Sequence, residues 1–145
     1  APLSASAQSR TVALRSDRGY AADGSRFYFF EGFDFLLGET VSISNSSARV
    51  RYNSTGEDRE LLTRRSVLWY HGWDNLGINQ DGIAFLGGGP LSRFVVAPLE
   101  GWGKQGARMV KGRVYAIRIG ERDRAVKLKV LDVDREVLKF EWDWL

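Results

Sequence analysis

The only histidine of this chain lies in the aromatic run Trp69-Tyr70-His71-Gly72-Trp73. An imidazole nitrogen is a common axial ligand of haem iron, and aromatic rings beside it can pack against the macrocycle. The rings of Trp69, Tyr70 and Trp73 also have the chemistry of a stacking platform for sugar rings or bases. A third interpretation is a hydrogen-bonded histidine at the edge of a core, with a structural role alone. The sequence leaves all three interpretations open.

Met109 is the only methionine, and it lies in a glycine-rich segment ahead of the C-terminal strands. A thioether can ligate haem iron opposite a histidine, so His71 and Met109 are the one His and Met pair available for such a site. The alternative is that Met109 fills a gap in the core. Trp102 lies in the same segment and adds another aromatic ring to the candidate binding surface.

Few residues have the types and spacing that catalysis needs. The chain has no cysteine, which excludes zinc-thiolate, iron–sulfur and thiol chemistry, and it has no Gly-x-Ser-x-Gly nucleophile motif. Glu31 and Asp34 are near enough in sequence to form a carboxylate pair, although such residues more often occur in turns. We therefore expect a binding protein, with an unrecognised hydrolase as a further alternative.

The composition indicates a globular domain with a mixed surface. Among 145 residues, 21 basic and 18 acidic side chains give a net charge of +3, which gives little reason to expect nucleic-acid binding. No run approaches the roughly 20 apolar residues of a membrane-spanning helix. Residues 1–10 are mostly small or polar, so we expect disorder there. Such a start is typical of the segment behind a removed signal peptide or lipid anchor, which favours export.

The elements that would position the candidate residues are clearest in the last third of the chain. Residues 114–119, 126–130 and 138–144 alternate along the chain with the two-residue period of a strand. Val126, Leu128 and Val130 are predicted to face inward, and Lys127 and Lys129 outward. A sheet with one apolar face must pack against another layer, so earlier strands are expected to cover it.

Shorter strands are predicted through the rest of the chain. Breaks between strands are predicted at Glu31-Gly32 and at Gly38-Glu39, a turn at Asn45-Ser46-Ser47, and loops at residues 71–82 and 98–112. The strands between these breaks are predicted at residues 26–30, 33–37, 40–44, 49–52, 66–70, 83–86 and 94–97. About ten short strands with little or no helix predict a single all-β domain over residues 11–145, an antiparallel β-sandwich or partly open barrel.

The C-terminal half carries a family resemblance. Its residues are Phe94-Val95-Val96-Ala97-Pro98, then Val114-Tyr115-Ala116-Ile117-Arg118, the run 125–130, and the closing Leu138-Lys139-Phe140-Glu141-Trp142. In this order they resemble the HmuY-like family of bacterial haem-binding proteins. The family's Trp-Asp-Leu-Ala-Phe-like strand has a counterpart at best in residues 33–37. The resemblance implies a secreted, periplasmic or outer-membrane-anchored all-β protein that holds haem between loops, with iron ligated by His or Met.

The leading hypothesis is an exported, non-enzymatic domain that binds a small apolar or aromatic ligand, with haem first among the candidates. His71 and Met109 are then the candidate ligands of haem iron, because they are the one His and Met pair in the chain. The alternative is a carbohydrate-binding or protein-interaction module that uses an aromatic loop surface. Its candidate residues are Trp69, Tyr70, Trp73 and Trp102.

Overall fold

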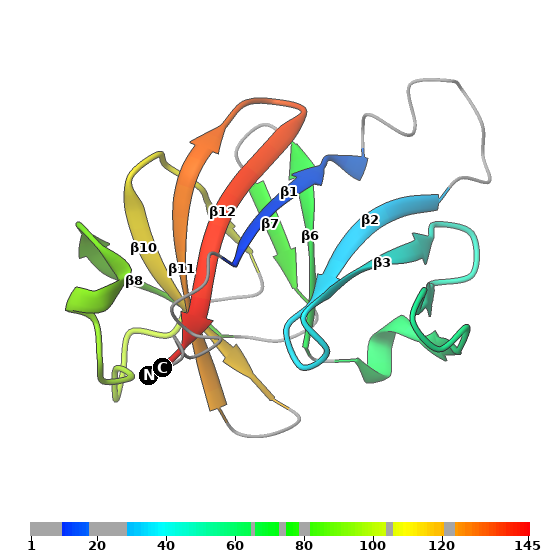
Figure 1. Cartoon of the computed structure of the whole chain (residues 1–145), viewed down its shortest axis with the longest axis horizontal. Helices are drawn as coiled ribbons and strands as arrows, with labels where there is room; N and C mark the ends of the chain where they lie inside the picture. The colour runs from blue at the N-terminus through cyan, green and yellow to red at the C-terminus, as the bar shows by residue number, and fades with distance from the viewer. Residues whose placement is uncertain are drawn as a thin grey trace, which may run out of the picture.

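The computed structural model describes residues 10–17, 29–64, 66–72, 75–78, 82–103, 106–120 and 124–145. Two antiparallel sheets face each other and do not close into a barrel (Figure 1). The prediction of an all-β, sandwich-like fold is therefore confirmed. Residues 1–9, predicted to be disordered, and Trp73, a predicted ligand contact, lie outside the described residues.

The first sheet has five strands in the order β1, β12, β11, β10, β8. Its outer members are β1 (Thr11–Arg15) and β8 (Ile83–Gly88). The C-terminal strands β10 (Arg113–Ile119), β11 (Arg124–Val133) and β12 (Val137–Trp144) form its centre. All three strands predicted from the C-terminal alternation are thus present.

The second sheet has seven strands in the order β5, β4, β3, β2, β6, β7, β9. Four of them come before residue 61: β2 (Phe29–Asp34), β3 (Glu39–Ser44), β4 (Arg49–Arg51) and β5 (Asp58–Glu60). The others are β6 (Val67–Gly72), β7 (Asn75–Ile78) and β9 (Gly106–Arg108). Two 3-10 helices also occur in the described residues, η2 (Leu61–Thr63) and η3 (Leu91–Arg93).

The main core lies between the two sheets. Inward side chains of β10, β11 and β12 pack against those of β2 and β6, because alternate residues of each strand point to the same layer. A second, smaller core lies on the outer side of the seven-stranded sheet and includes Val41, Ile43, Val50, Tyr52, Leu61 and Val67. The seven-stranded sheet is therefore apolar on both faces at β2 and β6.

One predicted break is wrong. Strand β2 runs without a break through Glu31 and Gly32, and the chain turns at residues 35–38, at the other predicted break before β3. Gly32 serves close packing, since a Cβ there would lie 2.6 Å from Ile43 Cδ1 and 3.0 Å from the Leu68 carbonyl oxygen. Asp34 directs the turn, because its Oδ1 accepts hydrogen bonds from the amides of Leu36 and Leu37.

The outer face of the five-stranded sheet is also less exposed to solvent than predicted. Lys127 is 8% exposed, and its Nζ donates to the carbonyl oxygens of Leu91 and Phe94 at 2.9 and 2.8 Å. Residues 91–103 cross this face as η3 followed by an irregular segment. The strand predicted at residues 94–97 is not formed. Val114 and Ala116 lie on the same face and are completely buried.

Candidate functional site

His71 forms a hydrogen-bonded chain with Trp69 and Asp17. The Trp69 indole N–H donates to His71 Nε2 at 3.1 Å, and His71 Nδ1 lies 2.9 Å from Asp17 Oδ2. Because Nε2 accepts a hydrogen bond, the proton of a neutral His71 is on Nδ1 and is donated to Asp17. Both ring nitrogens are engaged, so a metal ligand role would require one of these bonds to break.

The other predicted site residues are not brought to one surface. Tyr70 and Met109 are 0% and 1% exposed in the main core, where Tyr70 points to the opposite side of β6 from Trp69 and His71. Trp102 belongs to the segment over the other sheet, where its indole N–H donates to the Pro98 carbonyl and Arg118 stacks on its ring. The expected platform of Trp69 with Tyr70 is therefore not formed, since neighbours on one strand face opposite ways.

A groove of about 630 Å³ opens elsewhere, between β1 and the turn that joins β2 to β3. Strand β1 supplies one wall and the β2–β3 turn the other, and the last residues of β12 complete the lining. The lining residues are Arg10, Thr11, Val12, Ala13, Phe33, Phe35, Leu36, Leu37, Gly38, Thr40, Trp142 and Trp144.

Aromatic rings form the base of this groove. Trp142 meets Phe33 and Phe35 edge to face, with ring centroids 5.6 and 5.0 Å apart, and Trp144 meets Trp142 at 5.8 Å. Such edge contacts fix the rings in place. Phe33 and Phe35 are almost fully buried, whereas Trp144 and Leu37 reach solvent. The groove therefore has a rigid aromatic base, and Leu37 and Trp144 are accessible apolar side chains within a lining whose accessible surface is mostly polar.

Charged and polar groups line the mouth of the groove. Arg10 Nη1 lies 3.1 Å from Asp143 Oδ1, and its guanidinium lies 4.8 Å from the Trp142 ring centroid. The Arg10 carbonyl accepts a hydrogen bond from the Trp142 amide of β12. Along an antiparallel edge strand, alternate residues direct their backbone groups to the partner strand, so the backbone groups of Ala13, three residues on, point away from β12. Polar groups of a ligand can therefore meet backbone and side-chain partners beside the aromatic base.

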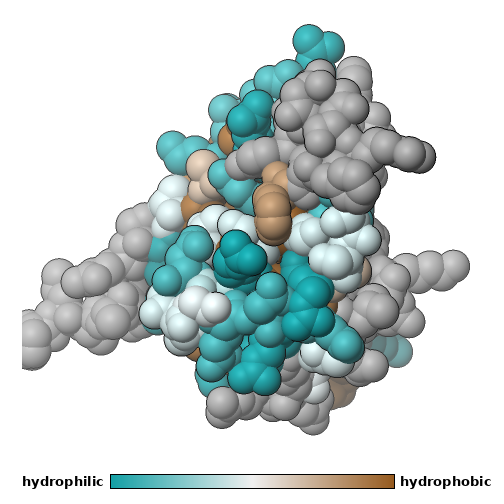
Figure 2. Space-filling view, turned by 90° about the vertical axis from the view of Figure 1, so that its right-hand side faces the viewer, coloured by the Kyte–Doolittle hydropathy of each residue, from teal (hydrophilic) through white to brown (hydrophobic). Residues whose placement is uncertain are grey.

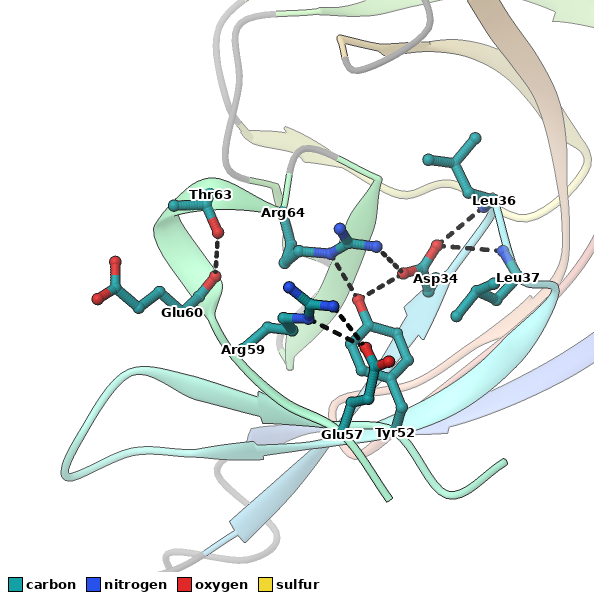
Figure 3. A network of polar contacts seen from close by, with 9 residues as sticks. All are labelled: Asp34, Leu36, Leu37, Tyr52, Glu57, Arg59, Glu60, Thr63 and Arg64. Carbon is teal, nitrogen blue, oxygen red and sulfur yellow. Dashed lines mark hydrogen bonds and ion pairs between the residues drawn. The ribbon is translucent and has the colours of Figure 1, made fainter. Parts of the chain in front are cut away.

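A buried polar network holds the β2–β3 turn that forms the second wall (Figure 3). Asp34 is completely buried, and its Oδ2 accepts a hydrogen bond of 2.6 Å from the Tyr52 hydroxyl. Arg64 donates to the Tyr52 oxygen at 2.8 Å and lies 3.6 Å from Asp34 Oδ2. Burial, and then the hydrogen bond to Asp34, raise the pKa of Tyr52 well above its usual range. Tyr52 is thus a permanent donor, which makes the network a structural one.

The sequence contained a signal for the groove, although it was not interpreted that way. Phe33 and Phe35, like Trp142 and Trp144, are two residues apart near the end of a strand. Paired aromatics at strand ends can either complete a core or border an opening, and the sequence does not show which. Here they do both, because β1 is an edge strand and leaves the end of the sandwich open.

Within the ranges given above, no group of three or more His, Asp or Glu side chains is arranged to hold a metal ion. None of the helices in those ranges has the length and hydropathy to span a membrane.

Because comparisons with known proteins found no match, a functional assignment depends on the geometry of the site. No protein-family model matches the chain, and no similar protein was found among curated proteins or solved structures. The fold and the groove together define an open antiparallel β-sandwich with an aromatic recess at one end.

Proposed function

We propose that this chain is a non-enzymatic binding module that takes a small ligand with an apolar or aromatic body into the groove between β1 and the β2–β3 turn. The observation that carries this proposal is the groove itself, whose volume of about 630 Å³ lies within the usual range for ligand sites. Its aromatic base is largely buried, and most of the lining that solvent reaches is polar, so polar groups beside aromatic rings would orient a bound ligand. The Arg10–Asp143 pair would orient a polar end of the ligand.

A small apolar ligand is favoured over a glycan by the state of the tryptophan rings. Carbohydrate modules stack sugars on open ring faces, but Arg10 covers one face of Trp142 and Arg124 covers one face of Trp144 at 4.1 Å. Trp142 is also only 6% exposed. The open ring faces that sugar stacking needs are therefore reduced, and an apolar body would contact the accessible Leu37 and Trp144 while the polar lining meets its polar groups.

Haem belongs to the proposed ligand class, and the resemblance to haem-binding proteins keeps it among the candidates. Neither His71 nor Met109 lines the groove. Iron in a haem bound there would need its axial ligands from other residues, or would be held through the porphyrin alone. The axial role of His71 and Met109 is thus a separate proposal, with its own test.

The groove is tested with haemin, followed by its absorbance, and with 1-anilinonaphthalene-8-sulfonate, followed by its fluorescence. Thr40→Trp should fill the groove, because Thr40 lines it and is exposed. We expect at least one probe to saturate, and Thr40→Trp to weaken it about tenfold or more. Asn53→Trp, in the exposed turn between β4 and β5, is the matched control and should bind as the unmodified chain does.

Two results would count against the proposal: neither probe saturates, or Thr40→Trp and Asn53→Trp bind equally well. For haemin, His71→Ala and the volume-conserving Met109→Leu separate the two questions. A Soret shift that these variants leave unchanged places the iron away from both side chains while keeping the groove. A shift that they abolish, with Thr40→Trp having no effect, would move the site away from the groove.

A further inference from the structure

The irregular segment over the five-stranded sheet presents aliphatic side chains to solvent. Within residues 94–99, the apolar loop, the exposed fractions are 74% for Val95, 76% for Val96 and 100% for Leu99. Burying one such side chain is worth roughly 1.5–3 kcal/mol, so this exposure forgoes a sizeable stabilisation. The face on the right of Figure 1, seen directly in Figure 2, is by contrast mostly hydrophilic where it is described.

The apolar loop is held firmly, so its exposure follows from the fold. Lys127 binds the carbonyl oxygens at its start, and the Trp102 indole binds the Pro98 carbonyl near its end. Beyond the loop, the Gly103 amide donates to the Ile83 carbonyl of β8 at 2.6 Å. A segment pinned on both sides does not fold its aliphatic side chains back onto the sheet.

The surroundings of the apolar loop are basic. Residues 82–120 contain six basic residues and one acidic residue, a net charge of +5, whereas the rest of the chain has 15 basic and 17 acidic residues. Arg93, just before the loop, donates to the Gly88 carbonyl at the end of β8. Arg113 of β10 stacks on the exposed ring of Phe85, which is also in β8. Lys111 is exposed in the turn that precedes Arg113. Arg93, Lys111 and Arg113 thus place positive charge beside the end of β8 that leads into the apolar loop, and Glu100 directly follows the loop.

We propose that the apolar loop and the basic residues around it dock on an anionic lipid surface. Val95, Val96 and Leu99 would enter the boundary between headgroups and acyl chains, while Arg93, Lys111 and Arg113 would meet lipid phosphates. Three aliphatic side chains on one loop fall far short of the roughly 1,000 Å² of contact that a stable protein interface needs. A bilayer has no such threshold, because each inserted side chain adds binding energy by itself.

Cosedimentation with lipid vesicles tests this proposal. Vesicles of three parts phosphatidylcholine to one part phosphatidylserine should bind the chain, and pure phosphatidylcholine vesicles should bind it about tenfold less. Replacing both Val95 and Val96 by Asp should weaken binding about tenfold or more. The double substitution Asn53→Asp and Ser54→Asp is the matched control, because it adds the same two charges in the exposed turn between β4 and β5, outside both the apolar loop and the groove, and it should bind the vesicles unchanged.

A second measurement does not depend on a charged substitution in the loop. The chain has no cysteine, so Leu99→Cys and Asn53→Cys each accept one environment-sensitive fluorophore. The label at position 99 should shift to the blue on anionic vesicles, and the label at position 53, in the exposed turn between β4 and β5, should not. The proposal is overturned by three results: no binding to anionic vesicles, equal shifts at both positions, or a double Asp variant that binds like the unmodified chain. A loop that instead controls self-association by light scattering, without vesicle binding, would overturn it in favour of a second copy.

Discussion

At the scale of single residues, Asp34 shows how a carboxylate that has the appearance of a catalytic group can be structural. Its two oxygens accept bonds from the amides of Leu36 and Leu37 and from the Tyr52 hydroxyl, and Arg64 lies beside them. A buried carboxylate needs such partners because its desolvation is costly. With these acceptor positions occupied, Asp34 organises the turn that forms one wall of the groove.

Removing one donor from this network should be costlier than removing a comparable donor elsewhere. Tyr52→Phe deletes a bond to a charged carboxylate, so we expect the free energy of unfolding at pH 7 to fall by about 2 kcal/mol. Tyr115→Phe is the control, because its hydroxyl donates to the neutral Arg108 carbonyl at 2.8 Å and should cost about 1 kcal/mol. Urea unfolding of both variants measures the difference. Equal losses would mean that the charge of Asp34 contributes nothing extra.

Tyr52 should also give the protein an alkaline limit. Its pKa is raised in the folded state, chiefly by burial, while an unfolded tyrosine ionises near pH 10. Above that pH the folded chain retains a proton that the unfolded chain loses. Stability therefore falls as pH rises, by about 1.4 kcal/mol from this group at pH 11. Unfolding of the unmodified chain and Tyr52→Phe should show converging stabilities between pH 9 and about 11, and parallel curves would contradict the assignment.

At the scale of elements, the segment 91–103 depends on one side chain of the strand beneath it. Lys127→Met keeps the volume but removes two bonds to carbonyl oxygens, which can turn to water instead. We expect a global stability change below about 1 kcal/mol, together with amide exchange at Arg93, Phe94 and Gly103 that is faster by about tenfold or more. Lys129→Met, on the same face of β11, should leave the exchange of these amides unchanged. Uniform acceleration across all strands would show that Lys127 holds the whole sheet and not this segment.

The contact between β6 and the β11–β12 turn depends on a glycine. Gly72 has φ +85°, and a Cβ there would lie 2.5 Å from the Arg135 carbonyl oxygen and 3.2 Å from Ser16 Cβ. Gly101 has φ +86° with nothing within 4 Å of such a Cβ. We expect Gly101→Ala to cost about 1 kcal/mol from backbone strain alone and Gly72→Ala about 3 kcal/mol from strain and overpacking. Thermal unfolding should separate the two variants, and similar costs would mean that the turn moves aside freely.

Sequence patterns were most informative where a strand is wet on one face. The alternation in β11 and β12 predicted both elements, because solvent on one side preserves the two-residue period. Lys127 was assigned to the wrong environment, since nothing local shows that residues 91–103 cross above it. Gly32 was interpreted as a break between strands, because the close approach of Ile43 and Leu68 that demands glycine comes from distant strands. These failures share one cause: the deciding contact is non-local.

At the scale of the whole molecule, β12 is the strand on which the five-stranded sheet depends. It pairs with β11 on one side and β1 on the other, and Leu138, Phe140 and Trp142 enter the main core. Burial of these side chains is worth roughly 1.5–3 kcal/mol each, which approaches the net stability of a typical domain. We expect a chain that ends at Val137 to show no cooperative thermal transition by circular dichroism. A retained transition would mean that the seven-stranded sheet folds alone.

The candidate site was less accessible to prediction than the fold. The groove joins residues near 10, 35, 40 and 143, and it exists because β1 is an edge strand while the β2–β3 turn extends past it. His71 was a candidate ligand because it is the only histidine, yet both of its ring nitrogens form hydrogen bonds within the protein. Residue chemistry therefore identified a plausible donor, whereas the position of an opening required the topology.

The pairing of β1 with β12 joins residues 11–15 to residues 137–141. On a ribosome, β1 emerges long before its hydrogen-bonding partner exists, and the five-stranded sheet is completed only when the last strand is released. Loop closure over so great a separation makes folding slow, on the order of milliseconds to seconds for such β topologies. Until then β1 is unpaired and the apolar face of the sheet is incomplete and exposed. Such a partly folded chain can bind chaperones or aggregate.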